Sequence, residues 1–179
     1  FDLMGVNGKF SSLTGYSAQP VINLTIMALI IIGGIGFLTW EDIQRNRWHF
    51  SKYRMQSKVI ITMTGLLIFI PALWFFFCEF SDLPLGERIL SSFFQSVTPR
   101  TAGFNTADLT LISEAGILIM IMLMLTGGSP GSTAGGMKTT TVAVLISSSL
   151  AVFKQKEDAH FFKRRIPDDA IRSAGTILM

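Results

Sequence analysis

Residues Thr98 to Leu109, with the sequence TPRTAGFNTADL, place a proline, an arginine, a glycine and several hydroxyl and amide side chains directly after a short apolar segment. Gly103 has no Cβ, so it can adopt a positive φ and let neighbouring carbonyl groups point at one axis. Carbonyl oxygens arranged in this way replace the water shell of a dehydrated cation. These residue types therefore favour cation coordination by backbone carbonyls around Gly103.

A second polar stretch, TGGSPGSTAGGMK at 126–138, is rich in glycine. Gly131 and Gly136 have the spacing of a phosphate-binding loop, but Met137 stands before Lys138, so the GxxxxGK[ST] pattern fails by one insertion. No predicted β-strand precedes the stretch either. The pattern argues against nucleotide binding and favours flexible backbone that lines an aqueous path.

Other chemistry finds little support in the sequence. His49 and His160 lie in loops far apart, with no metal-ligand spacing around them, and Cys78 is the single cysteine. No acid–base pair and no nucleophile with its base occur in the loops or the apolar segments. We therefore expect neither enzymatic activity nor a cofactor in this chain.

The composition is that of a membrane protein. Hydrophobic residues make up 49% of the chain and charged residues 15%, against about 25% charged in soluble domains. Uncharged runs at 10–40, 59–78 and 115–137 reach the length of about 18 residues that spans a bilayer. A fourth run covers 139–153. The net charge of +3 comes from basic residues that flank these runs, so we interpret it as a topology signal and expect no nucleic-acid partner.

Lysine and arginine predict the orientation. The segment 41–58 holds five basic residues against two acids, and the tail 154–172 holds six against four, so both are expected on the cytoplasmic side. The segment 79–114 carries five acids and only two basic residues, Arg88 and Arg100, and is expected outside. The chain then runs inward through about 20–40, outward through about 58–78, and inward again from about 110.

The outer segment contains a helix that is too short to span. Residues 86–98 place apolar side chains at helical spacing over only about 20 Å, and Pro99 then ends the helix. Because Asp108 and Glu114 also face outward, the chain must return to the side from which it came. This pattern favours a re-entrant pore loop, although an extracellular loop with an amphipathic surface helix remains open.

The last apolar region is too long for one span. Ala115 to Phe153 is 39 residues with one charge, and a continuous helix of that length would reach about 58 Å. The glycines and Pro130 within 127–136 place the break there. Either this stretch lies within the membrane along the aqueous path, or it is a cytoplasmic linker to an interfacial helix.

Three charged features have two interpretations each. Arg100 either anchors the pore loop, paired with Glu87 or Glu114, or steers ions directly. Lys138 either reaches the inner interface with its long side chain or contacts the glycine-rich stretch. The tail KQKEDAHFFKRRIPDD is either a solvated loop or a docking point for a cytosolic partner.

Taken in order, TPRTAGFNTADL and TGGSPGSTAGGMKTTT resemble the Trk/Ktr/HKT superfamily of potassium transporters, most closely the membrane subunits of bacterial Ktr systems (KtrB). The resemblance covers essentially the whole chain. It implies an all-α membrane protein of helix–pore loop–helix repeats like those of potassium channels, with one helix broken by a glycine-rich intramembrane loop. Phe1-Asp2 matches Phe104-Asn105, and each pair is followed by a long helix that ends near a glycine pair.

The resemblance also implies a division of the chain. Residues 1–40 would end the second repeat, 41–57 form a cytoplasmic loop, 58–153 the third repeat, and 154–179 a cytoplasmic loop and the entry to the fourth repeat. Within the third repeat, the expected parts are a helix at 58–78, a pore helix at 86–98, a filter at 99–106 and a broken helix at 110–153. Because the chain begins within a pore loop and without methionine, we expect it to be part of a longer polypeptide.

The implied site has two parts. The filter would comprise Thr101, Ala102, Gly103, Phe104 and Asn105, with Phe1 and Asp2 from the preceding repeat. The gate loop would comprise Gly127, Gly128, Ser129, Pro130, Gly131, Ser132, Thr133, Ala134, Gly135 and Gly136.

The function implied is potassium uptake across the plasma membrane by a multi-pass pore-forming subunit. The resemblance adds a homodimer, a cytosolic nucleotide-binding regulatory ring of the RCK type, and sodium as a coupling ion in some members. The rival interpretation is a non-transporting assembly or anchor subunit whose glycines serve helix packing.

Overall fold

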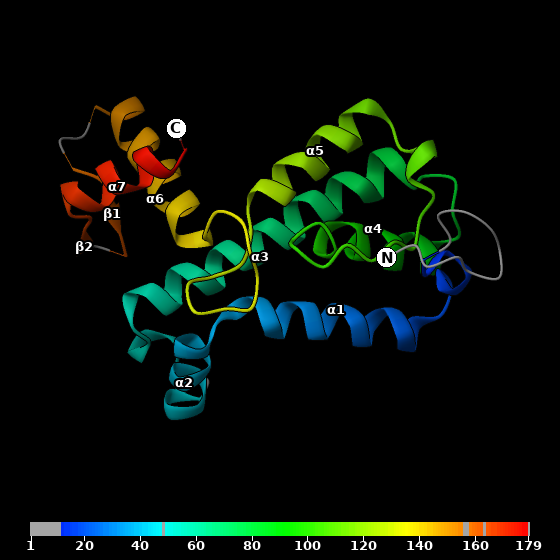
Figure 1. Cartoon of the computed structure of the whole chain (residues 1–179), viewed down its shortest axis with the longest axis horizontal. Helices are drawn as coiled ribbons and strands as arrows, with labels where there is room; N and C mark the ends of the chain where they lie inside the picture. The colour runs from blue at the N-terminus through cyan, green and yellow to red at the C-terminus, as the bar shows by residue number, and fades with distance from the viewer. Residues whose placement is uncertain (1–11, 48, 156–157, 163, 179) are drawn as a thin grey trace.

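The computed structural model describes residues 12–47, 49–155, 158–162 and 164–178. This part of the chain is mostly helical, as the sequence predicts (Figure 1). The elements are α1 (Pro20–Ile35), α2 (Phe37–Asn46), α3 (Met55–Trp74), α4 (Leu85–Val97), α5 (Glu114–Leu125), α6 (Thr139–Phe153), β1 (His160–Phe161), β2 (Arg164–Arg165) and α7 (Asp168–Leu178). Short 3₁₀ turns lie at Thr14–Tyr16, Phe50–Lys52 and Leu109–Leu111.

The short helix α4 lies at the centre of the larger lobe, where it packs on α3, α1 and α5 (Figure 1). The smaller lobe holds α6, α7 and the β1–β2 hairpin, and α3 connects the two lobes through its contacts with both α4 and α6. The antiparallel hairpin was not expected from the sequence. It packs on the rest of the lobe partly through Phe161, which contacts Val59, Met63 and Ala143.

One continuous helix of the described chain is long and apolar enough to cross a membrane, Met55–Glu79, with 25 residues and a mean hydropathy of 2.3. The expected span at 20–40 is not straight: α1 ends at Ile35 and α2 continues after a bend of 97°. Gly36 makes the bend with φ 87° and ψ 146°, which side chains strongly disfavour. The sequence predicted a long helix that ends near Gly33 and Gly34, and α1 ends at Ile35, but the turn into a second helix at Gly36 was not predicted, because the apolar run continues to Trp40.

The bend also changes the expected loop at 41–57, because α2 continues to Asn46 and α3 begins at Met55. Asp42 of α2 is buried and accepts hydrogen bonds from the Ser57 hydroxyl at 2.6 Å and the Arg54 backbone N–H at 3.1 Å. The Arg54 Nε lies 3.5 Å from the same carboxylate. These bonds tie α2 to the first turn of α3.

Pro71 shapes the contact between α3 and α4. Proline has no N–H, so the carbonyl of Leu67 loses its helical partner. The Ser96 hydroxyl of α4 donates to that region of α3, with its Oγ 2.7 Å from the Ile68 carbonyl oxygen and 3.2 Å from that of Leu67. The helix then ends in a π-helical turn, η3 (Phe75–Glu79). There the Phe76 carbonyl accepts from Arg88 Nε at 2.7 Å.

We expect Ser96→Ala to lower the free energy of unfolding by about 1 kcal/mol, because a buried hydrogen bond between α3 and α4 is lost. Thermal unfolding in detergent measures the change. Ser92→Ala is the matched control, since the Ser92 hydroxyl bonds only to the Arg88 carbonyl of its own helix. In a Pro71→Ala background, Ser96→Ala should lower the free energy of unfolding by less than it does in wild type. An equal decrease in both backgrounds would refute this role of the proline.

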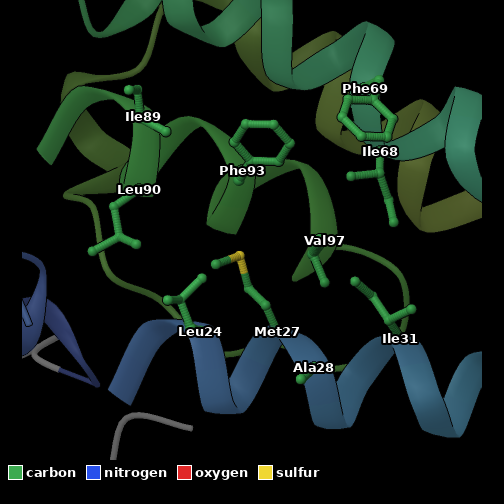
Figure 2. A pocket seen from close by; sticks show the side chains of 10 residues that line it. All are labelled: Leu24, Met27, Ala28, Ile31, Ile68, Phe69, Ile89, Leu90, Phe93 and Val97. Carbon is green, nitrogen blue, oxygen red and sulfur yellow. The ribbon is translucent and has the colours of Figure 1, made fainter. Parts of the chain in front are cut away.

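An apolar groove of about 510 Å³ lies between α1, α3 and α4. Figure 2 shows Leu24, Met27 and Ile31 of α1 facing Leu90, Phe93 and Val97 of α4. Three of the lining residues, Met27, Ile68 and Val97, form a buried cluster with Phe94. This packing holds α4 in place and with it the polar segment that follows Val97.

Candidate ion pathway

The polar segment after α4 has an unusual backbone. Thr101 and Gly103 have φ values of 69° and 75°, and both residues are exposed. A positive φ is uncommon for a β-branched residue such as Thr101 and marks a conformation that its surroundings impose. Gly103 lacks the Cβ that would strain this conformation, and no heavy atom lies within 4 Å of where a Cβ would stand.

The carbonyl groups of this segment divide into two sets. Within the described residues, no hydrogen bond reaches the carbonyl oxygens of Thr101, Ala102 or Gly103. The neighbouring carbonyls are occupied: that of Thr98 accepts from the N–H groups of Ala102 and Gly103, both at 3.2 Å. The Phe104 carbonyl accepts from the Thr98 hydroxyl at 2.6 Å. Three successive carbonyls thus remain available to a ligand.

The end of the segment is held by residues from the start of the described chain. The Asn105 carbonyl accepts from the Leu13 N–H at 2.8 Å, and the Asn105 N–H donates to the Ser12 hydroxyl at 3.1 Å. The buried Asn23 amide donates to the carbonyls of Tyr16, Ser17 and Gln19 and so fixes the turn into α1. Phe1 and Asp2, expected to form part of the filter, lie outside the described residues.

Arg100 is 7% exposed, and its Nε has no hydrogen-bond partner within the described residues. The expected pairing with Glu87 or Glu114 was wrong: neither carboxylate is within ion-pair distance of Arg100. Glu87 stands in the first turn of α4, whereas Arg100 follows its last turn, so the length of the helix, about 20 Å, separates them. The partial negative charge at the C-terminal end of α4 favours a cation at this position.

A hollow of about 370 Å³ opens where the segment ends, at Thr106, Ala107 and Asp108. Its lining includes the carboxylates of Glu79, Asp82, Glu87 and Asp108. Hydrogen bonds from the hydroxyl and N–H of Thr110 lower the pKa of Asp108, so its negative charge is retained at neutral pH. A concave surface lined with one sign of charge raises the local concentration of counter-ions, here cations.

The glycine-rich stretch is non-helical from Thr126 to Lys138, between α5 and α6. Its two ends pair with each other: Gly127 N–H donates to the Met137 carbonyl at 2.9 Å, and Met137 N–H donates to the Leu125 carbonyl at 3.2 Å. A Cβ on Gly127 would stand 1.7 Å from the Gly135 carbonyl oxygen, so only glycine fits there. The stretch is a closed loop with a defined shape.

The loop caps the bend between α1 and α2. The last carbonyls of a helix need partners from outside it. The Gly34 carbonyl accepts from Ser129 N–H at 2.9 Å, and the Gly33 carbonyl accepts from Thr133 N–H at 3.3 Å. In the other direction, Phe37 N–H at the start of α2 donates to the Gly131 carbonyl at 3.2 Å.

Two further contacts complete the loop. The hydroxyls of Ser129 and Thr139, both buried, lie 3.2 Å apart and join the loop to the first turn of α6. Lys138 Nζ donates to the Ala134 carbonyl at 2.8 Å. Of the two interpretations of Lys138, the structure favours contact with the loop. Sequence reasoning missed the bend as the loop's partner, although the triplet Gly33, Gly34 and Gly36 marks it.

Comparison with known proteins identifies the family of this chain. The family model described as TrkH, cation transport protein, matches residues 1–175. The potassium/sodium uptake protein NtpJ of Enterococcus hirae is 38% identical over 99% of this chain and 39% of its own length. The Ktr system potassium uptake protein B of Bacillus subtilis is 37% identical over 87% of this chain and 36% of its own length. The chain therefore spans about two fifths of these relatives.

The fold agrees with a solved structure. The crystal structure of the potassium transporter TrkH from Vibrio parahaemolyticus matches 96% of this chain and 38% of its own, with a TM-score of 0.74 and 17% sequence identity. The chain therefore shares the fold of the matching part of that structure. The chain belongs to the TrkH family of cation transport proteins, which confirms the resemblance drawn from the sequence. A transport family also agrees with the expectation that the chain is no enzyme.

Proposed function

We propose that this chain forms part of the ion pathway of a potassium uptake protein in the plasma membrane. The observation that carries the proposal is the run of three available carbonyls at Thr101, Ala102 and Gly103, directly beyond the C-terminal end of α4. Available carbonyls favour a cation that has lost its water, and the relatives are named as a potassium/sodium and a potassium uptake protein.

One such segment covers only one side of a cation, so the pathway needs further segments. We propose that residues 58–153 form one helix–pore loop–helix repeat of four, and that the segment before α1 belongs to the preceding repeat. The bonds between Asn105 and residues Ser12 and Leu13 support this, since they join the two segments where the pathway would end. A homodimer, an RCK-type regulatory ring and sodium coupling belong to the same proposal.

We also propose that the loop 126–138 is a gate. In the present arrangement it is closed onto the α1–α2 bend by the bonds of Ser129 and Thr133 to Gly34 and Gly33. Movement of the loop would release those carbonyls, which then need water or ions as partners. A gate of this kind differs from its open form by only a few kcal/mol, because a regulator shifts the equilibrium no further than its differential affinity allows.

Gly36→Ala tests the contact between the bend and the loop. A Cβ at Gly36 would stand 2.6 Å from the Pro130 carbonyl oxygen, on a backbone whose φ of 87° already disfavours a side chain. We expect the substitution to destabilise the closed state by about 1.4 kcal/mol relative to the open state. Potassium uptake without the regulator should then rise about tenfold. The control is Gly34→Ala, where no heavy atom lies within 4 Å of the added Cβ. Equal uptake by both variants would refute the contact's role.

Complementation tests the function itself. The intact protein, expressed in a cell that lacks its own potassium uptake systems, should restore growth at limiting potassium. Rubidium uptake per inserted protein gives the rate. A non-transporting assembly or anchor subunit would insert normally and restore neither growth nor rubidium uptake.

A further inference from the structure

A basic hollow of about 400 Å³ lies at the N-terminal end of α3, far along the chain from the carbonyl segment and the glycine-rich loop. The 3₁₀ turn Phe50–Lys52 and the first residues of α3 form one wall, and the β1–β2 hairpin forms the other. Four cationic side chains line it: Lys52, Arg54, Lys58 and Arg164. No carboxylate is among the described residues that line it.

These four charges are unequally compensated. Arg54 lies 3.6 Å from Glu41 and 3.5 Å from Asp42, so its charge is largely balanced. Lys58 donates to the Ser51 carbonyl at 2.8 Å, which is a neutral acceptor. Lys52 and Arg164 form no ion pair within the described residues. The hollow therefore holds three uncompensated positive charges, a composition suited to a phosphate group.

Two exposed aromatic rings lie at one side of the hollow: Phe162 lines it, and Phe50 contacts Phe162. Phe50 and Phe162 are 40% and 48% exposed, and their ring centroids are 6.3 Å apart in an edge contact. Exposed aromatic rings beside lysine and arginine are typical of the boundary between a membrane and water. The position agrees, because the membrane-length helix Met55–Glu79 begins at the hollow.

We propose that this hollow binds the phosphate headgroup of an anionic phospholipid, such as phosphatidylglycerol. The cations hold the phosphate, and the Phe50 and Phe162 rings contact the glycerol and the upper acyl chains. The two aromatic rings favour a lipid over free phosphate, which would leave these rings in contact with water. Basic hollows at the ends of membrane helices bind anionic headgroups by the same physics.

Native mass spectrometry of the intact protein in detergent tests the proposal, with added phosphatidylglycerol and, in parallel, phosphatidylcholine. The test variant is Lys52→Gln/Arg164→Gln, which removes two exposed and unpaired cations. The control is Arg45→Gln/Arg172→Gln, which removes the same charge from exposed positions outside the hollow. The variant Lys52→Arg/Arg164→Lys keeps both charges and shows whether the fold is intact.

We expect wild type to bind phosphatidylglycerol in preference to phosphatidylcholine, and the test variant to bind it about tenfold more weakly. The control and the charge-conserving variant should bind like wild type. An equal loss in the control would show non-specific attraction and overturn the proposal. So would displacement of the lipid by millimolar inorganic phosphate, which indicates a free-anion site. Unchanged lipid binding with lost affinity for a cytosolic partner would assign the hollow to a protein interface instead.

Discussion

Replacing Gly103 with serine is expected to reduce the preference for potassium over sodium about tenfold. Gly103 has a φ of 75°, a conformation that is about 1–2 kcal/mol less favourable for a residue with a side chain. The strain is relieved only if the backbone dihedral angles at this position change. That change alters the directions of the carbonyls on either side, which are the groups proposed to replace the ion's water. Apart from the adjacent residues in the chain, no heavy atom of the described residues stands within 4 Å of the new Cβ, so the expected effect comes from the backbone and not from a clash.

Competition between rubidium and sodium in uptake assays measures this preference. Gly86→Ser is the matched control, because Gly86 also has open space around it but lies in the first turn of α4, with no positive φ. The control should keep the wild-type preference. If Gly103→Ser inserted normally and kept it as well, carbonyl coordination at this segment would be refuted.

The elements that the sequence predicted are those set by local pattern. Apolar run lengths and proline predicted the helix at 86–98, and the structure has α4 at Leu85–Val97. The 39 residues from Ala115 to Phe153, with one charge, exceed one span, and the structure is non-helical between Leu125 and Thr139. The bilayer thickness limits the length of one spanning helix, and Pro99 ends the helix before it because proline has no backbone N–H. Neither effect depends on residues that are distant in the sequence.

The features that the sequence missed depend on distant contacts. Gly36 sits in an apolar run that continues to Trp40, and the bend depends on Pro130 and Gly131 from a remote part of the chain. Arg100 was assigned partners by charge, without the separation that α4 imposes. The β1–β2 hairpin has two residues in each strand, too few to show an alternating pattern.

The missed contacts also change the argument for the gate. Glycine content alone suggested a loop that adopts many shapes at little cost. The structure instead shows one shape, in which Gly127 and Gly128 are required by close neighbours: a Cβ at Gly128 would stand 2.5 Å from the Cβ of Ala134. The proposed closed state is therefore specific, and its free energy resides in contacts that mutation can remove.

Deleting residues 128–135 is expected to raise potassium uptake by at least about tenfold and to remove most of its dependence on a cytosolic regulator. The deletion removes the bonds of Ser129 and Thr133 to the bend, and with them the closed arrangement. It removes the contacts of Gly128 and Ser129 with Thr139 but can be closed over a short distance, because Gly127 and Gly136 are already adjacent: a Cβ on Gly136 would lie 3.2 Å from the Gly127 Cα. The preference for potassium over sodium should be unchanged, since the carbonyl segment is elsewhere.

Uptake per inserted protein, with and without the regulator, distinguishes a gate from a linker. The matched control replaces 128–135 with alternating glycine and serine of the same length, which keeps the reach of the loop but removes the constraints of Pro130 and the Thr133 hydroxyl. A gate predicts raised uptake for both variants, larger for the deletion. A linker predicts impaired uptake for the deletion and normal uptake for the control, because only length matters to it. Lower uptake by the deletion at normal insertion, with an unchanged response to the regulator, would therefore refute the gate.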